Sequence, residues 1–159
     1  MPGDFQSRDT PFEDADRPKS LKLWWNAETV GKGDILGFLF GERKETIQAA
    51  ELLFEKMRQD RNLSITRGQL RRFAVDLSSG HYGFKYGYHN FYMQFVRKLV
   101  SLGLLEKCMI WDPNRGTTVR VYRLRIQQIP TRSPPSGFVK QVWQIAKSWN
   151  DYISSGNRR

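Results

Sequence analysis

The chain has little of what several common protein classes require. One cysteine, Cys108, among 159 residues leaves no partner for an intrachain disulfide, which fits a reducing compartment. No apolar run approaches the roughly 20 residues of a membrane-spanning helix. The first residues are acidic and polar, unlike a signal peptide. We therefore expect an intracellular protein that does not enter a membrane.

Patterns typical of catalysis and metal binding are also missing. His81 and His89 have no Cys, Asp or Glu close by in the sequence, whereas a metal site needs at least three ligands at workable spacing. The stretch Gly31–Asp34 lacks the Gly spacing and the Lys-Ser/Thr pair of a phosphate-binding loop. Cys108 stands among apolar neighbours, which favours a small core residue over a nucleophile. We expect no metal, no cofactor and no enzymatic activity.

Acidic residues are scarce in one half of the chain. Residues 61–132 contain 13 Lys and Arg but only 3 Asp and Glu, so they carry the whole net charge of +10. The sequence pI near 10.0 favours a polyanionic partner, either DNA or RNA. Aromatic residues at 13% must largely fill a core, which excludes a disordered polycation.

Apolar periodicity predicts an α+β chain that is mainly helical. We expect helices over 44–60, 66–77, 88–103 and 138–153, a short strand over 63–65, and a hairpin over 104–127. The turn of this hairpin is the Pro- and Gly-containing stretch Asp112–Gly116. Thr66 followed by Gln69 has the spacing of a capping box at the start of the second helix.

Composition divides the chain into five parts. These are an acidic disordered tail over 1–20, a domain with an N-terminal extension over 21–129, a Pro-rich linker over 130–137, the helix over 138–153, and a disordered tail over 154–159. The C-terminal helix has one apolar stripe, made of Phe138, Val142, Ile145, Trp149 and Tyr152. It serves either as a homodimer or protein-partner contact, or packs back on its own protomer together with Trp24 and Trp25.

The helix predicted over 88–103 has two contrasting faces. At about 100° per residue, one face carries Phe91, Phe95, Leu99 and Leu102, which we expect to be buried. The opposite face displays Asn90, Met93, Gln94, Arg97 and Ser101 and contains no acid. The connection before this helix is rich in Gly and aromatic residues, whose rings either pack on the helix or stack on unpaired bases.

The order helix, short strand, helix, helix, hairpin resembles the winged helix-turn-helix superfamily. The closest local match is the segment 95–107, Phe-Val-Arg-Lys-Leu-Val-Ser-Leu-Gly-Leu-Leu-Glu-Lys, which looks like a recognition helix running into the first wing strand. Gly103 permits the helix to stop, and the two leucines that follow anchor the strand. The resemblance covers about half of the chain and implies a winged-helix domain with a C-terminal amphipathic helix.

The resemblance also implies which side chains contact DNA. The third helix of this superfamily usually enters the major groove, which makes Asn90, Gln94 and Arg97 candidates for base contacts. Candidates for the backbone and wing are Arg67, Arg71, Arg72, Lys85, Lys98, Arg115, Arg120, Arg123 and Arg125. An alternative for Asn90 and Gln94 is that they are ordinary polar residues on a solvent-exposed helix face. An alternative for Arg123 and Arg125 is that they flank an edge strand and protect it from aggregation.

Three functions compete on this evidence. The first is a double-stranded DNA-binding protein, a transcriptional regulator or a small replicon or viral factor. The second is a non-catalytic subunit of a larger nucleoprotein assembly, with RNA or DNA as its ligand. The third, a protein adaptor, fits less well because adaptors of this type seldom concentrate so much positive charge on the module.

Overall fold

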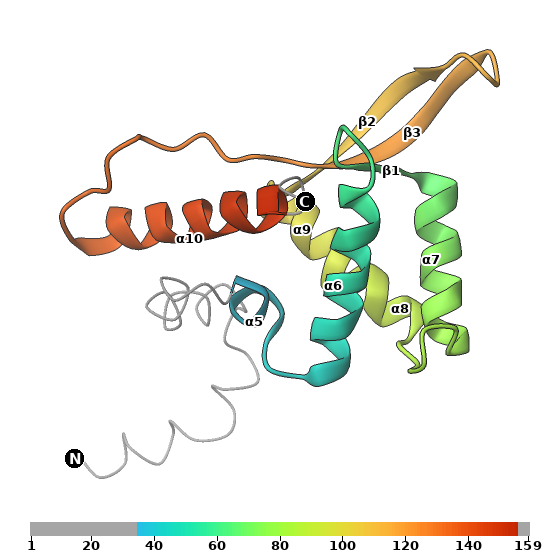
Figure 1. The fold of residues 1–159 in the computed structure, drawn as a ribbon, viewed down its shortest axis with the longest axis horizontal. Helices are drawn as coiled ribbons and strands as arrows, with labels where there is room; N and C mark the ends of the chain where they lie inside the picture. The colour runs from blue at the N-terminus through green and yellow to red at the C-terminus, as the bar shows by residue number, and fades with distance from the viewer. Residues whose placement is uncertain (1–34, 156–159) are drawn as a thin grey trace, which may run out of the picture.

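The computed structural model describes residues 35–155, which form an α+β fold that is mainly helical (Figure 1). The elements are α5 (Ile35–Phe40), α6 (Lys44–Arg58), β1 (Ser64–Thr66), α7 (Arg67–Ser79), α8 (Tyr88–Phe91), η1 (Tyr92–Arg97), α9 (Lys98–Ser101), β2 (Leu105–Asp112), β3 (Thr117–Leu124) and α10 (Gly137–Ser154). This order confirms the predicted succession of helices, short strand and hairpin. Within 35–155, no helix is long and apolar enough to cross a membrane.

The three strands form one antiparallel sheet in the order β1-β3-β2. Strand β1 pairs with only three residues of β3, from Ser64 opposite Arg123 to Thr66 opposite Val121. Beyond Val121 the hairpin therefore has two strands. Figure 1 shows this outer half of β2 and β3 extending away from the helices.

The short strand begins one residue later than predicted because the chain turns sharply before it. Leu63 has a φ of 55°, which is uncommon for a residue other than glycine. The Asp60 carboxylate accepts hydrogen bonds from the backbone N–H groups of Asn62 and Ser64 and from the Ser64 hydroxyl, at 3.0, 3.2 and 2.7 Å. These bonds stabilise the turn and delay the strand to Ser64.

Residues 88–101 form one continuous helix whose middle six residues are a π segment, η1. Phe91, Phe95 and Leu99 are fully buried, as predicted. Leu102 is 38% exposed, so its predicted burial is wrong. A π turn takes one residue more than an α turn, so a uniform helical wheel misplaces the residues that follow it. Val96 is buried beside Phe95, and the helix stops before Leu102 can turn inward.

The core lies between the helices and the inner half of the sheet. Its largest buried side chains are aromatic, and Phe95 contacts both Phe91 and Phe40 with ring centroids 5.4 and 4.8 Å apart. Phe54 of α6 packs edge-to-face against the fully buried Trp149 of α10, with ring centroids 5.6 Å apart. Helices that are distant in sequence are thereby joined into one core.

Helix α10 packs on its own protomer through its C-terminal half. The Trp149 indole N–H donates to the carbonyl of Arg125 at 2.8 Å, and Asn150 exchanges two hydrogen bonds with the backbone of Gln127 at 2.7 and 2.9 Å. The predicted stripe is only half correct, because Phe138 and Val142 are exposed. The stretch before α10 is bonded to it, since the Trp143 indole donates to the Pro130 carbonyl at 2.8 Å.

Several expectations concern residues outside the described range. These are the acidic tail over 1–20, the contribution of Trp24 and Trp25, and most of the tail over 154–159. The last residue of α10 is Ser154, so this helix ends one residue later than the predicted end at Ile153.

Candidate nucleic-acid interface

An open groove of about 960 Å³ lies between the start of α7, the start of the 88–101 helix and the hairpin. We call it the arginine groove. It is lined by Thr66, Arg67, Gly68, Gln69, Arg71, Arg72, Tyr88, Tyr92, Met109, Asp112, Arg115, Val119, Arg120 and Tyr122. No residue of α6 is among them, which agrees with the mixed charge of that helix. Three segments that are distant in sequence thus share one concave surface.

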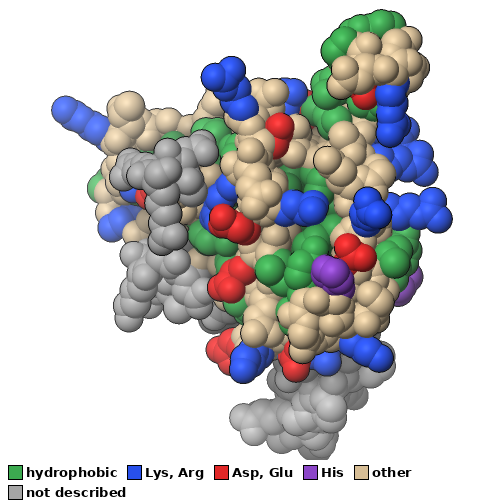
Figure 2. Space-filling view, turned by 45° about the vertical axis from the view of Figure 1, so that its right-hand side comes forward, with side chains coloured by type: hydrophobic (Ala, Val, Ile, Leu, Met, Phe, Trp, Pro, Cys, Tyr) green, Lys and Arg blue, Asp and Glu red, His purple; other side chains and the backbone are tan. Residues whose placement is uncertain are grey.

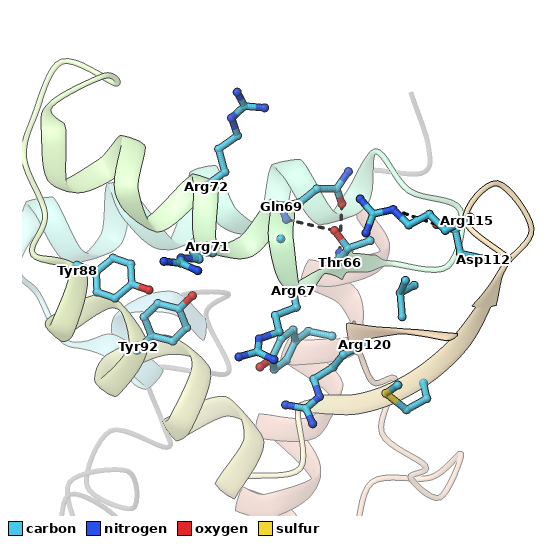
Figure 3. Close-up of a pocket in the computed structure, with 14 residues that line it drawn as sticks. Thr66, Arg67, Gln69, Arg71, Arg72, Tyr88, Tyr92, Asp112, Arg115 and Arg120 are labelled. Atoms are coloured by element: carbon cyan, nitrogen blue, oxygen red, sulfur yellow. Dashed lines mark hydrogen bonds and ion pairs between the residues drawn. The ribbon is translucent and has the colours of Figure 1, made fainter. Parts of the chain in front are cut away.

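Five arginines gather around this groove, and all five are exposed. They are Arg67, Arg71 and Arg72 on α7, Arg115 in the hairpin turn and Arg120 on β3. Figure 3 shows Arg71 directed toward the two tyrosines and Arg67 and Arg120 close to each other on the same side of α7, whereas Arg72 extends away from them and Arg115 lies near Thr66 and Gln69. In Figure 2, Lys and Arg side chains likewise project along the right-hand edge of the molecule.

Little negative charge opposes these arginines. Among the described residues that line the groove, Asp112 is the one carboxylate. It contacts the guanidinium of Arg115 at 3.8 Å and accepts a hydrogen bond from the backbone N–H of Asn114 at 2.9 Å. This carboxylate therefore stabilises the hairpin turn, and the remaining four arginines give the groove a strong positive potential.

The first turn of α7 lines the same groove. Thr66 accepts a hydrogen bond from the backbone N–H of Gln69, and the Gln69 side chain accepts one from the backbone N–H of Thr66. The predicted capping box is thereby confirmed. The positive end of the helix dipole is directed at this surface and adds to the attraction of the arginines for anions.

Two tyrosines form the wall of the groove opposite the hairpin. The rings of Tyr88 and Tyr92 are one helical turn apart, with centroids separated by 4.9 Å. Burial and a hydrogen bond with Tyr88 raise the pKa of Tyr92 to about 12, although the nearby Arg71 opposes the shift. Tyr92 therefore stays a neutral hydrogen-bonding group beside the arginines over the whole physiological pH range.

The three predicted base contacts lie outside the arginine groove. Asn90 and Arg97 are exposed on the 88–101 helix, and Gln94 is half-buried. Arg97 extends along the helix surface, with a guanidinium nitrogen 3.7 Å from the sulfur of Met93. Asn90 and Arg97 are therefore accessible to a ligand, and Gln94 is less exposed than either.

The nine predicted backbone and wing residues separate into two groups. Arg67, Arg71, Arg72, Arg115 and Arg120 line the groove, and the other four do not. Lys85 is exposed, with its aliphatic stem against Gly80. The half-buried Lys98 donates to the carbonyl of Leu39 and lies 5.7 Å from the Phe40 ring, so it joins two helices.

The wing candidates Arg120 and Arg123 do not share one face of the sheet. Strand alternation places Arg123 on the face of the sheet opposite Arg120. Arg123 is half-buried, and its cross-strand partner is Glu106. Arg125 donates to the same carboxylate at 2.8 Å, and this bond lowers the pKa of Glu106. The alternative reading, in which these two arginines serve the strand itself, fits their partners.

The sequence-based interpretation missed the aromatic and apolar lining of the groove. Tyr88 ends the aromatic stretch whose rings are expected either to pack on the helix or to stack on unpaired bases, whereas Tyr92, Met109 and Tyr122 carry no predicted role. The signal available was the spacing of four between the tyrosines, which puts both on one helical face. The rings of the preceding loop pack inward instead, since Tyr86 is buried and Tyr82 contacts Phe73 at 5.5 Å.

Within residues 35–155, no three His, Cys, Asp or Glu side chains lie close enough together to hold a metal ion. Cys108 is half-buried on β2, with its sulfur 3.9 Å from the carbonyl of Glu106. Comparisons with protein-family models, curated proteins and solved structures find no match to this chain. The interface geometry is therefore the basis for a functional assignment.

Proposed function

We propose that the protein is a non-catalytic, intracellular double-stranded DNA-binding protein of the winged-helix type. The arginine groove holds the phosphate backbone, and the exposed face of the 88–101 helix meets the base edges in the major groove. A transcriptional regulator or a small replicon or viral DNA-binding factor fits this activity.

One observation carries the proposal, namely the convergence of five arginines from two helical turns and a hairpin on one concave surface. Arginines on a single helix face are common on solvated surfaces. Here the chain folds back from residue 72 to residue 115 to bring two further guanidinium groups to the same groove. Guanidinium groups pair with phosphate oxygens in a fixed, forked geometry, so the arrangement suits a backbone with regularly spaced charges.

The dimensions of the surrounding elements favour a duplex over a small anion. The 88–101 helix is about 21 Å long at its rise of roughly 1.5 Å per residue, and the major groove, about 12 Å wide, admits one helix. Asn90 and Arg97 are exposed on this helix and match the adenine and guanine edges respectively. The groove and the helix together offer both backbone and base contacts.

A titration with labelled nucleic acids tests the proposal. The full chain is compared with a variant that combines Arg67→Ala, Arg71→Ala and Arg120→Ala. The control is Arg43→Ala, because Arg43 is an exposed arginine, with 75% side-chain exposure, that lies outside the groove.

We expect the triple variant to lose most of its affinity for duplex DNA while the Arg43→Ala variant binds like the parent. Melting temperatures of all three proteins should agree, since the four residues are exposed. Equal loss in the control would place the binding surface elsewhere. Tighter binding to structured RNA than to duplex DNA would instead favour a subunit of an RNA-containing assembly.

A further inference from the structure

Trp111 is a large apolar side chain in an unusually open position. It lies on β2, one residue before the hairpin turn, and 63% of its surface is exposed. Its partner on β3 is Thr118, in the two-stranded part of the hairpin beyond β1. Burial of an indole in the core normally stabilises a fold, and Trp111 is not buried, so folding does not explain this placement.

The register of the hairpin places Trp111 on one of the two faces that contribute to the arginine groove. Met109, Arg120 and Tyr122 line the groove from this face of the sheet, whereas Asp112 and Val119 line it from the opposite face. Side chains two residues apart on a strand point to the same face, about 7 Å apart, so Trp111 follows Met109 outward. Arg120 is the cross-strand partner of Met109 and is therefore diagonal to Trp111. The indole stands at the outer end of the cationic surface.

We propose that Trp111 stacks on an unpaired nucleobase where a duplex opens into single strands, so that forked or partly single-stranded DNA is the preferred ligand. This inference rests on the proposed function of the arginine groove. The groove binds the phosphates of the paired region, and the hairpin extends beyond it to reach the first unpaired base. An indole offers a flat π surface that any base can cover, so the contact reads the junction and not the sequence.

The charge around Trp111 favours a nucleobase over an apolar protein partner. Arg120 is diagonal to it across the hairpin on the same face, and Arg115 lies in the adjoining turn, so two groove-lining cations belong to the same end of the hairpin as the indole. The neighbouring Ile110 provides an internal comparison. It is 38% exposed on the same strand and does not line the groove, but it is on the face of the sheet opposite Trp111, the face of its cross-strand partner Val119.

The experiment compares two ligands with the full chain. One is a blunt DNA duplex, and the other is the same duplex with a forked end of two unpaired strands. Binding of both is measured for the parent, Trp111→Ala, Trp111→Phe and the matched control Ile110→Ala, with melting temperatures recorded for each. All of these substitutions are at exposed positions of the hairpin.

We expect the parent to bind the fork more tightly than the blunt duplex. Trp111→Ala should weaken fork binding roughly 5- to 150-fold, as reported by alanine substitution of a base-stacking ring, and leave blunt-duplex binding unchanged. Trp111→Phe should retain part of the preference, and Ile110→Ala all of it.

Two results would overturn the inference while the proposed function stands. One is equal binding of fork and blunt duplex by the parent. The other is a Trp111→Ala variant that affects both ligands alike or neither of them, and an effect on neither would point to a protein contact. Failure of the parent to bind either ligand in a salt-dependent manner would overturn the proposed function itself.

Discussion

Thr66 and Gln69 exchange two hydrogen bonds, at 3.1 and 3.2 Å, across the first turn of α7. Both residues also line the arginine groove. The pair therefore has two roles, since it begins the helix and fixes the position of Arg67 between them. Because Thr66 is the last residue of β1, the same bonds join the sheet to the helix.

Thr66→Ala should lower the free energy of unfolding by about 1 kcal/mol, within the range of roughly 0.5–2 for loss of an N-cap side chain. Urea unfolding measures this loss. Thr66→Ser keeps the hydroxyl acceptor and should retain most of the stability. If Thr66→Ala unfolds at the parental midpoint, the capping box does not stabilise the protein in solution.

Arg115→Ala should weaken binding to every duplex by a similar factor. Its guanidinium lies in the hairpin turn and has only a 3.8 Å contact with Asp112 to restrain it, so it is available to a phosphate. Phosphate contacts carry little sequence information. Titration with several unrelated duplexes measures the effect. A loss confined to one sequence would mean that Arg115 reads bases.

Arg97→Ala should separate specificity from affinity. A guanidinium that contacts guanine contributes about 1–3 kcal/mol of discrimination against another base. We expect a larger loss on a selected site than on a scrambled one, and a melting temperature close to that of the parent because Arg97 is exposed. An equal loss on both duplexes would make Arg97 a backbone contact. A large fall in melting temperature would show that the helix faces the other way.

Tyr92 should ionise at about pH 12, above the ordinary value of 10.0, because of its burial and its hydrogen bond with Tyr88. The folded state holds this phenolic proton more tightly than the unfolded state does. Stability from this group is therefore complete below pH 10 and is lost as the pH rises toward 12.

A titration of phenolate absorbance checks this value. Tyr92→Phe should remove an ionisation step near pH 12, and Tyr88→Phe should move that step part of the way back toward 10.0, since one of the causes of the raised pKa is gone. An unchanged titration curve in the Tyr92→Phe variant would contradict the assignment.

Much of the fold is predictable from local patterns in the sequence. Phe91, Phe95 and Leu99 recur at helical spacing and are buried. The hairpin turn lies at the Pro- and Gly-containing stretch Asp112–Gly116, as predicted. The exposure of Leu102 and the positive φ of Leu63 could not be predicted from such patterns. A π segment and a left-handed residue both arise when tertiary packing outweighs local preference, which no periodicity reveals.

The candidate site is predictable in its charge but not in its composition. The excess of arginine in residues 61–132 identifies the correct region. Which arginines converge depends on the strand register, which puts Arg120 and Arg123 on opposite faces. The proposed role of Trp111 depends on the same register, because the face to which an apolar strand residue points cannot be read without its partners.

The salt dependence of duplex DNA binding by the full chain tests the central claim most directly. Five arginine–phosphate contacts predict a slope of about −4.5 in a plot of log affinity against log salt, or a roughly 500-fold loss between about 50 and 200 mM. Each arginine removed from the groove should reduce the slope by about 0.9. Binding that is indifferent to salt, or a slope that the groove variants leave unchanged, would contradict the account.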